Sequence, residues 1–371
     1  MSTFPWNDRK LGFGFMRLPK KDGVIDLGET CRMVDRFLAE GFTYFDNAYT
    51  YAGAEIAFGE TVASRHPRSS FTLTNKMKGI LLRPDFGPAE MFFGQLERCR
   101  VDYFDVYFLH SLQESQYKVY SDYDCWDFCQ KQMAEGRIRH FGISYHGSPE
   151  MLERILTEHP EIEIVQLQIN YVDWDSTAIW SGRNYEVARR FGKDIVVMEP
   201  VKGGLLADIK PEAKKLLDGL DPTVSPSSFA LRFAASLPGV KTVLSGMSSE
   251  AQMNDNLATF GDFRPLTETE QNVLRDVAKA ILDAPTVPCT NCRYCTDGCP
   301  MHISIPDVFK SYNMILTFGE HNRPHLYYTG QLQTGSGRAS DCIACGQCEA
   351  ACPQHLEIIR LLREASLHLD K

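Results

Sequence analysis

The sequence predicts an α/β protein in which a TIM (β/α)8 barrel is followed by a small helical domain. Short apolar runs alternate with amphipathic stretches between about residues 11 and 260, and such alternation is typical of parallel strands joined by right-handed helical crossovers. Eight such units in roughly 250 residues fit a barrel better than a doubly wound sheet. Beyond residue 283 the chain becomes rich in cysteine while its apolar residues keep a helical spacing.

Each of the eight predicted strands is rich in Val, Ile, Leu and Phe, as expected where both faces of a parallel sheet are covered. The first contains Gly12-Phe13-Gly14, which lacks the third glycine of a dinucleotide-binding fingerprint and is interpreted as a barrel strand. The predicted strands are Leu11–Leu18, Thr43–Asp46, Ser70–Lys76, Tyr103–His110, His140–Ser144, Ile164–Ile169, Ile195–Pro200 and Thr242–Ser245.

Amphipathic helices are predicted between the strands. They are Glu29–Glu40, Ala89–Cys99, Tyr123–Glu135, Pro149–Glu158, Tyr185–Phe191, Ser227–Ser236 and Glu250–Phe260. A further helix, Glu268–Leu282, precedes a segment with two prolines among four residues, which makes a stiff connector. We therefore predict a barrel domain over residues 1–283 and a second domain over residues 284–371, with helices at Pro306–Phe318 and Leu356–Leu369.

Composition limits the classes of partner. The chain has 371 residues, of which 43% are hydrophobic and 23% charged, as in a globular protein with a large domain and a small one. A net charge of −9 without a basic stripe argues against nucleic acid as a partner. The first ten residues lack the apolar core of a signal peptide, and no apolar run is long enough to cross a bilayer. We expect a cytoplasmic protein that binds neither nucleic acid nor membrane.

Four ionisable side chains are expected to meet at the mouth of the barrel. Asp46, Lys76 and His110 end the second, third and fourth strands, and Tyr51 lies in the loop after Asp46. A phenol with a pKa near ~10 is a weak acid, but a nearby ammonium favours the phenolate, and a carboxylate keeps that ammonium charged. A neutral His can orient a carbonyl oxygen. These groups suit protonation of an oxygen while a hydride reaches carbon.

Each of these residues also has a purely structural interpretation. Asp46 can cap a turn, Lys76 can be a solvated strand end, and His110 can be a hydrogen-bonded core residue. Their occurrence at consecutive strand ends favours the catalytic interpretation, because active sites of TIM barrels lie at the carboxyl ends of the strands.

Residues 1–260 resemble the aldo-keto reductases, a family of TIM-barrel carbonyl reductases that use NADH or NADPH. The resemblance rests on Phe45-Asp46-Asn47-Ala48 with Tyr51, on Thr74-Asn75-Lys76 and on Phe108-Leu109-His110. It implies that Tyr51 is the general acid. It further implies that Asp46 and Lys76 tune the acidity of this phenol and that His110 orients the carbonyl group.

The resemblance also implies a nicotinamide site. The implied contact residues are Ser144, Gln168, Met198, Gly246 and Asn256. The chain departs from the family pattern at two of the surrounding positions. Tyr145 replaces the Asn that usually follows the Ser, and Met198 replaces the aromatic residue that stacks on the nicotinamide.

A third departure concerns the adenosine phosphate. Gly246–Glu250 lacks the basic residues with which the family grips the 2′-phosphate of NADP, and a phosphate there would lose its charge-assisted hydrogen bonds. We therefore expect weak selectivity for NADP, or use of NAD. Titration of both reduced nucleotides tests this expectation, and a large preference for NADPH would contradict it.

Eight of the twelve cysteines fall in two runs with the same spacing, C-x2-C-x2-C-x3-C-P. This is the pattern of two-cluster [4Fe–4S] ferredoxins, in which the fourth Cys of each run ligates the other cluster. One cluster is accordingly assigned to Cys289, Cys292, Cys295 and Cys352, and the other to Cys342, Cys345, Cys348 and Cys299. Zinc is the alternative, but zinc sites usually separate two Cys pairs by about a dozen residues or more.

The remaining four cysteines, Cys31, Cys99, Cys125 and Cys129, are expected to be small buried apolar residues. Between the two runs, residues 303–341 form a segment that is long for a compact ferredoxin. The region resembles the helical two-cluster ferredoxin domains of larger redox enzymes, and fusions of such a domain to an aldo-keto reductase barrel form a recognisable subfamily. His302 and His355 each close a repeated Cys-Pro-x-His; each either bonds to a cluster sulfur or caps the next helix.

These observations predict an oxidoreductase that performs NAD(P)H-linked reduction of a small carbonyl-type substrate, with Tyr51 as proton donor and a two-cluster electron relay. A hydride carries two electrons and each cluster moves one, so either the clusters are structural or the protein exchanges electrons with a ferredoxin-like partner. One alternative is a ferredoxin-coupled enzyme that does not use nicotinamide as a hydride donor. The other is a non-catalytic nucleotide or redox sensor, which would need no proton donor.

Overall fold

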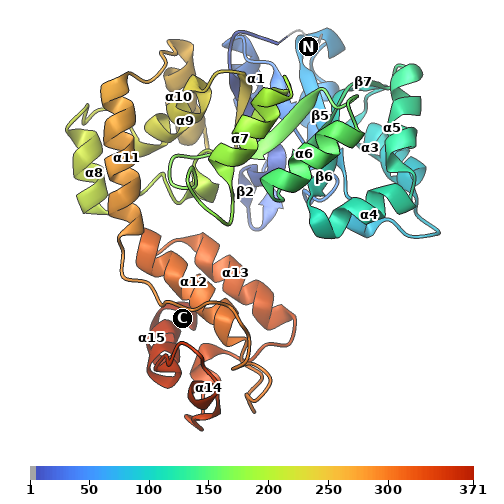
Figure 1. The fold of residues 1–371 in the computed structure, drawn as a ribbon. Helices are drawn as coiled ribbons and strands as arrows, with labels where there is room; N and C mark the ends of the chain where they lie inside the picture. Colours follow the sequence, from blue (N-terminus) through green and yellow to red (C-terminus); the bar gives the residue numbers. More distant parts are fainter. Residues whose placement is uncertain (1–5) are drawn as a thin grey trace. The chain divides into compact units, whose positions relative to one another are not determined.

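The structure is a computed structural model that describes residues 6–371 (Figure 1). It divides into two compact units. The first comprises the described residues up to Lys202 together with Ser227–Gln271, and the second comprises Gly203–Pro226 and Asn272–Lys371. Residues 203–226 thus group with the C-terminal part of the chain. The sequence-based boundary between residues 283 and 284 stays a prediction.

The first unit is a closed barrel of eight parallel strands that follow one another around the barrel in chain order, which confirms the predicted fold. A separate hairpin is formed by β2 (Lys20–Lys21) and β3 (Val24–Ile25). The barrel strands are β1 (Leu11–Gly14), β4 (Tyr44–Asp46), β5 (Thr72–Met77), β6 (Phe104–Leu112), β7 (Ile138–Tyr145), β8 (Ile164–Gln168), β9 (Asp194–Met198) and β10 (Val240–Ser245).

Helices surround the barrel (Figure 1). They are α1 (Leu27–Ala39), α2 (Ala54–Phe58), α3 (Pro88–Cys99), α4 (Glu114–Asp122), α5 (Cys125–Ala134), α6 (Pro149–Glu158), α7 (Ser181–Arg190), α9 (Pro226–Ser236) and α10 (Glu250–Gly261). Side chains of Asp26, Ser148 and Ser249 cap α1, α6 and α10 by accepting a hydrogen bond from a backbone N–H of the first turn, which satisfies a donor that the helix leaves unpaired. The short helices α2 and α4 were not predicted from the sequence.

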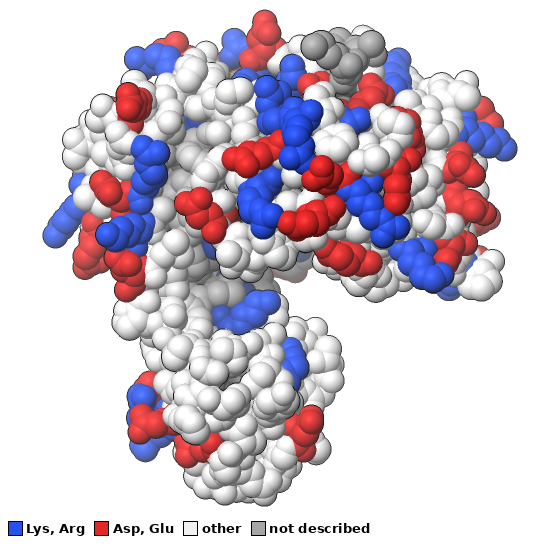
Figure 2. Space-filling model, viewed as in Figure 1, with Lys and Arg blue, Asp and Glu red and all other residues white. Residues whose placement is uncertain are grey.

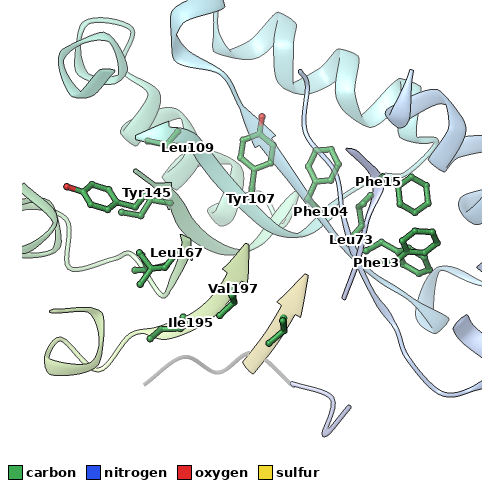
Figure 3. Close-up of a cluster of buried hydrophobic side chains, with 14 of the residues drawn as sticks. Phe13, Phe15, Leu73, Phe104, Tyr107, Leu109, Tyr145, Leu167, Ile195 and Val197 are labelled. Atoms are coloured by element: carbon green, nitrogen blue, oxygen red, sulfur yellow. The ribbon is translucent and has the colours of Figure 1, made fainter. Parts of the chain in front are cut away.

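Two glycines make room for the side chains inside the barrel. A Cβ at Gly12 would lie 2.7 Å from the Leu244 side chain, and one at Gly142 would lie 2.6 Å from the Phe108 ring. The interior is filled by Tyr44, Val106, Phe108, Ile164, Val196 and Leu244. Residues next to these in each strand, such as Phe13 and Tyr107, belong to the larger core outside the barrel, part of which Figure 3 shows.

The second unit is helical. It contains α8 (Pro211–Asp218), most of α11 (Glu268–Leu282), α12 (Ile305–Phe318), α13 (Asn322–Gln333), α14 (Gln347–Ala350) and α15 (Ile358–Leu369). Its core gathers Ile303, Phe309, Tyr328 and Leu362. The Tyr328 hydroxyl donates to Asp370 at 2.7 Å and accepts from the backbone N–H of Ala339 at 2.7 Å, which ties the end of the chain to the segment before the second cysteine run.

Charged side chains of both signs are interspersed over the face of the barrel unit that Figure 2 shows. Within residues 6–371, no helix combines the length and the apolar character needed to cross a membrane.

Candidate active site and cysteine-lined cavities

The structure brings the four predicted catalytic residues together at the carboxyl end of the barrel. Lys76 is fully buried, and its ammonium donates to both carboxylate oxygens of Asp46 at 2.7 and 2.6 Å and to the carbonyl oxygen of Asn47 at 2.8 Å. The Gln166 side chain donates to Asp46 at 3.1 Å. Burial lowers the pKa of Lys76, whereas the carboxylate of Asp46 acts to raise it. The pair is therefore rigid, because both charges are desolvated and satisfied by hydrogen bonds.

The hydroxyl of Tyr51 lies 3.5 Å from the Lys76 ammonium, which donates toward it. Burial raises the pKa of this phenol well above its usual value, and the carboxylates of Asp46 and Glu199 add to the shift, while Arg17 opposes it. The sequence argument expects Lys76 to favour the phenolate, but the shift runs the other way. The main reason is burial of the phenol, and the nearby carboxylates of Asp46 and Glu199 raise its pKa further. The raised pKa keeps the Tyr51 hydroxyl protonated at neutral pH.

His110 stands across the site from Tyr51. Their ring centroids lie 6.1 Å apart and the rings are nearly perpendicular. Burial, with the charges of Lys76 and Lys78, lowers the pKa of His110 to about 2, so the imidazole is neutral. Among residues 6–371, Nδ1 of His110 has no hydrogen-bond partner. A buried N–H without an acceptor is rarer than an acceptor without a donor, which favours the tautomer that carries its proton on Nε2.

A tyrosine from α4 holds the strand ends that carry these residues. The Tyr120 hydroxyl contacts the carbonyl oxygens of His110 at 2.6 Å and Met77 at 3.0 Å, and it accepts from the backbone N–H of Gly79 at 3.0 Å. A Cβ at Gly79 would lie 2.8 Å from the Tyr120 ring. Sequence reasoning missed this contact because the few apolar residues of α4 do not mark a helix face.

A buried polar network fixes the backbone on both sides of Lys76. Glu55 accepts hydrogen bonds from the amides of Asn75 at 2.9 Å and Gln95 at 2.8 Å and from Arg98 Nε at 2.6 Å. The Asn75 side chain accepts from the N–H of Lys76 at 2.8 Å, and Gln95 donates to the Lys76 carbonyl at 3.1 Å. Because Glu55 lies in the first turn of α2, which follows Tyr51, the network connects the loop of the phenol with the strand of the ammonium.

Three of the residues implied in nicotinamide binding lie at neighbouring strand ends. Ser144 is buried, and its hydroxyl lies 4.0 Å from the Met198 sulfur. Gln168 and Met198 are partners in the pairing of β8 with β9, and both side chains are half-buried. A second group follows β10, where Asn256 donates to the Ser245 hydroxyl at 2.9 Å beside Gly246.

Tyr145 points away from these residues. Its side chain is buried in the outer core, and its hydroxyl donates to the carbonyl of Ser148 at 2.5 Å. The replacement of Asn by Tyr at this position therefore removes an amide from the site without adding a phenol to it. The next residue, His146, is exposed, and sequence reasoning did not identify it.

Two arginines that are distant in sequence approach the loop after β10. A Cβ at Gly246 would lie 3.1 to 3.3 Å from the aliphatic stem of Arg17. Arg32 of α1 forms an ion pair with Glu250 at 2.6 Å, and both side chains are largely exposed. The basic groups near this loop thus come from the 3-10 turn after β1 (Phe15–Arg17) and from α1, and no local motif in residues 246–250 could have indicated them.

Tyr49 and Trp174, which lie in the loops after β4 and β8, contribute to packing. The ring centroids of Tyr49 and Phe86 lie 6.0 Å apart. The Arg98 guanidinium forms a cation–π contact with the Tyr49 ring, 5.2 Å from its centroid. Trp174 contacts Phe233 with centroids 5.6 Å apart.

The eight cysteines of the two runs line two cavities in the second unit. One cavity is bordered by Cys289, Cys292, Cys295 and Cys352, and the other by Cys299, Cys342, Cys345 and Cys348. In each case the fourth cysteine comes from the other run, as the ferredoxin spacing requires. Within residues 6–371, no three His, Cys, Asp or Glu side chains are grouped as ligands of a single metal ion. Each set of four thiols instead borders a space, which is the arrangement that a polynuclear cluster needs.

His302 and His355 occupy equivalent places in the two runs. Both have a left-handed backbone, with φ of 53° and 51°, and both are exposed. The residues that precede the following helices as N-caps are Ser304 and Glu357. The two histidines therefore close turns after the cysteines and do not cap these helices.

Comparisons with known proteins agree with this geometry. The description "Aldo/keto reductase family" matches residues 10–279, and "4Fe-4S dicluster domain" matches residues 288–357. Aldo-keto reductase str7 of Strobilurus tenacellus is 28% identical over 211 residues, which are 53% of this chain and 59% of that protein.

Two solved structures share the barrel fold. The holo form of aldo-keto reductase AKR11C1 from Bacillus halodurans has 25% identity and a TM-score of 0.58, over 73% of this chain and 92% of that chain. An aldo-keto reductase from Klebsiella pneumoniae in complex with NADPH has 16% identity and a TM-score of 0.58, over 72% of this chain and 90% of that chain. The chain belongs to the aldo/keto reductase family, as an oxidoreductase whose barrel is followed by a 4Fe–4S dicluster domain.

Proposed function

We propose that this enzyme reduces the carbonyl group of a small molecule, with Tyr51 as proton donor and a nicotinamide nucleotide as hydride source. The observation that carries the proposal is the contact of the Tyr51 hydroxyl with an ammonium that Asp46 holds in a fixed position. A protonated phenol, a fixed cation and a neutral imidazole are the groups that protonation of a carbonyl oxygen requires.

The residues around the site fit a nicotinamide nucleotide. Among the residues that the structure describes, the hydroxyl of Ser144 has a single hydrogen-bond contact, with the Met198 sulfur at 4.0 Å, so it is available to an amide. The aliphatic stem of Arg17 packs beside Gly246, which has no side chain in the way. The Arg17 guanidinium can donate charge-assisted hydrogen bonds to the phosphates of a dinucleotide. Gln168 and Asn256 complete the set of contact residues. When bound, the reduced nucleotide supplies a hydride to the carbonyl carbon.

The chain's own residues handle the proton. Nε2–H of His110 donates to the carbonyl oxygen and holds it near the Tyr51 hydroxyl. The hydroxyl of Tyr51 transfers its proton to that oxygen. The Lys76 ammonium then lies beside the phenolate oxygen and stabilises the negative charge left on it. Asp46 keeps Lys76 charged throughout, because burial alone would favour the neutral amine.

Replacement of Tyr51 by Phe tests the proton-donor role. Turnover of carbonyl compounds should fall by about a hundredfold or more, the usual contribution of a general acid, while nucleotide affinity stays within a few-fold. Tyr49→Phe removes a phenol two residues away that packs outside the site, and it should leave turnover unchanged. Equal turnover in Y51F and Y49F would refute the role. A protein that only senses nucleotide or redox state would bind the nucleotide with no turnover in any variant.

The coenzyme preference follows from the ion pair between Arg32 and Glu250. The Glu250 carboxylate pairs with the Arg32 guanidinium beside the loop after β10, so we propose weak selectivity for NADP or use of NAD. Dissociation constants of NADH and NADPH for the apoprotein should therefore be similar, or should favour NADH. Glu250→Gln releases Arg32 and should strengthen NADPH binding alone. A large NADPH preference of the unchanged protein would contradict the proposal.

We further propose that the two cysteine-lined cavities hold two [4Fe–4S] clusters that relay electrons to or from a ferredoxin-like protein. The two thiol sets support this, because each joins cysteines of both runs. Anaerobic purification should yield roughly eight iron and eight sulfide per chain, and identification of any bound nucleotide or flavin tests the hydride source. Substrate turnover driven by a reduced low-potential ferredoxin without nucleotide would favour the relay. If the clusters stay oxidised during turnover, their role is structural and the proposed relay is refuted.

A further inference from the structure

A second lysine follows Lys76 at the carboxyl end of β5. The backbone at Lys78 is extended, with φ −102° and ψ 100°, so the alternation of the strand continues through it. The side chain of Lys78 therefore lies on the same face as that of Lys76. Residues two apart in a strand are separated by about 6.5–7 Å, which places Lys78 one step beyond the catalytic residues toward the mouth of the barrel.

His146 holds the corresponding place after β7. Its backbone N–H donates to the carbonyl of Leu112 at 2.9 Å, which extends the pairing of β6 with β7 by one residue. Because Ser144 contacts Met198 inside the barrel, alternation places His146 on that same inner face. Desolvation at the mouth of the barrel is the main cause of the lowered pKa of His110 and of His146, the latter about 4, and the positive charge of Lys78 adds to both shifts. These contributions agree with the strand alternation, which places Lys78 and His146 on the same inner face.

The charge of Lys78 is not balanced by the protein. Among residues 6–371, its ammonium has no hydrogen-bond or ion-pair partner, and its pKa is lowered by burial without any compensating carboxylate. Asp46 is bound by Lys76. Glu199 acts on Tyr51 and His146 and has no corresponding effect on Lys78. A half-buried cation without a counter-charge is costly, and such a group beside an active site is a candidate for ligand binding.

We propose that Lys78, assisted by His146, binds an anionic group of the substrate, so that the preferred substrates are oxo acids. The carbonyl oxygen lies between Tyr51 and His110, and the anion lies one strand step farther out, within reach of the lysine's four-carbon stem. This inference rests on the proposed carbonyl reduction and names the class of its substrate. A carboxylate and a phosphate share the required charge, and paired substrates separate the two.

The experiment compares 2-oxobutanoate and 4-oxopentanoate with their methyl esters, which keep the carbonyl group and lack the charge. Dihydroxyacetone phosphate and dihydroxyacetone form the corresponding phosphate pair. The unchanged enzyme should give a higher kcat/KM for the anion of at least one pair. Lys78→Met should lower that anion's kcat/KM by about tenfold to a hundredfold, the range for loss of a charge-assisted hydrogen bond, and leave its neutral partner within about twofold. Lys78→Arg should restore most of the preference, and Lys20→Met, in the exposed β2–β3 hairpin, should change nothing.

Equal losses for anion and neutral partner in K78M would overturn the proposal, and so would a preference of the unchanged enzyme for the neutral compounds. Binding is measured separately by calorimetry with 4-oxopentanoate in the Tyr51→Phe background, where turnover is removed. If 4-oxopentanoate binds and Lys78→Met abolishes that binding, the anion site is supported even when no carbonyl compound is reduced. In that case only the proposed reductase function is refuted. Absence of Lys78-dependent binding, together with unselective turnover, refutes the anion site alone. Circular dichroism spectra of all variants check that they fold.

Discussion

Replacement of Glu55 by Gln isolates the contribution of the buried network that connects the Tyr51 loop with Lys76. Glu55 is 4% exposed. One of its oxygens accepts from Asn75 and Gln95, and an amide oxygen can keep both bonds. The other oxygen accepts from Arg98 at 2.6 Å, where the amide N–H₂ of Gln would face another donor. The substitution therefore leaves the Arg98 guanidinium without its counter-charge.

The magnitude follows from how far Arg98 is buried. Loss of one partner from a fully buried ion pair costs about 3–5 kcal/mol, whereas hydrogen bonds to charged groups contribute about 1.5–3 kcal/mol. The Arg98 side chain is 34% exposed and Glu55 5% exposed, so water takes over part of the lost interaction. We expect Glu55→Gln to lower the free energy of unfolding by about 2–3 kcal/mol. For a unit of this size that corresponds to a fall in Tm of roughly 4–12 °C.

The assay is thermal unfolding under anaerobic conditions, followed by circular dichroism, with Glu60→Gln as the matched control. Glu60 makes the same kind of ion pair with Arg100, but at 3.6 Å and with both side chains exposed, so its loss should cost less than about 1 kcal/mol. If the network also positions Lys76, E55Q should lower kcat more than it raises KM. Equal Tm values for E55Q and E60Q would refute the reasoning.

Three further outcomes are expected. The pKa of His110 is about 2 in the folded chain and ~6.5 in the unfolded chain, so the unfolded chain binds more protons below pH 6.5. The free energy of unfolding should therefore fall as the pH is lowered from 6.5, by at most about 1.4 kcal/mol per pH unit. Urea titrations at several pH values should show a smaller dependence on pH for His110→Asn. Cys299→Ser combined with Cys345→Ser removes two ligands of one proposed cluster, so roughly four irons should remain; loss of nearly all iron would refute the exchange of the fourth cysteine between runs. Gly142→Ala places a methyl group 2.2 Å from a carbonyl oxygen of β8. It should lower the free energy of unfolding by about 1–3 kcal/mol or more, which the same urea titration measures. An unchanged free energy of unfolding would show that β7 and β8 can move apart to admit the methyl group.

The barrel was predictable because its signal is repeated eight times. Each strand is a short apolar run between polar turns, and errors at the ends of single runs do not alter the count. The first predicted strand, Leu11–Leu18, illustrates this, since β1 ends at Gly14 and a turn of 3-10 helix follows over Phe15–Arg17. The meeting of the candidate catalytic residues was predictable for a related reason. Asp46, Lys76 and His110 end consecutive strands, and consecutive parallel strands are neighbours in the barrel.

The rest of the site depends on contacts that a linear pattern does not record. Arg17 reaches Gly246 only because β1 and β10 are neighbours where the barrel closes. Tyr120 and Glu55 act through single hydrogen-bonded groups on short helices, where too few apolar residues exist to indicate a face. The orientation of Tyr145 depends on strand register, because a shift by one residue exchanges the inner and outer faces. The contacts of these residues could be identified only from the three-dimensional structure.

The raised pKa of Tyr51 clarifies the role of Lys76. A cation that lowered the phenol's pKa in the resting enzyme would stabilise the phenolate, which cannot donate a proton. Here Asp46 and Asn47 accept the three short hydrogen bonds of the Lys76 ammonium. The contact of the ammonium with the Tyr51 hydroxyl, at 3.5 Å, is the longest and weakest of the four. Once the phenol has lost its proton, its oxygen becomes a much stronger acceptor, and the ammonium is already beside it. In the proposed reaction, this arrangement stabilises the charge that develops during proton transfer more than it stabilises the resting state, which is the condition under which a fixed charge accelerates a reaction.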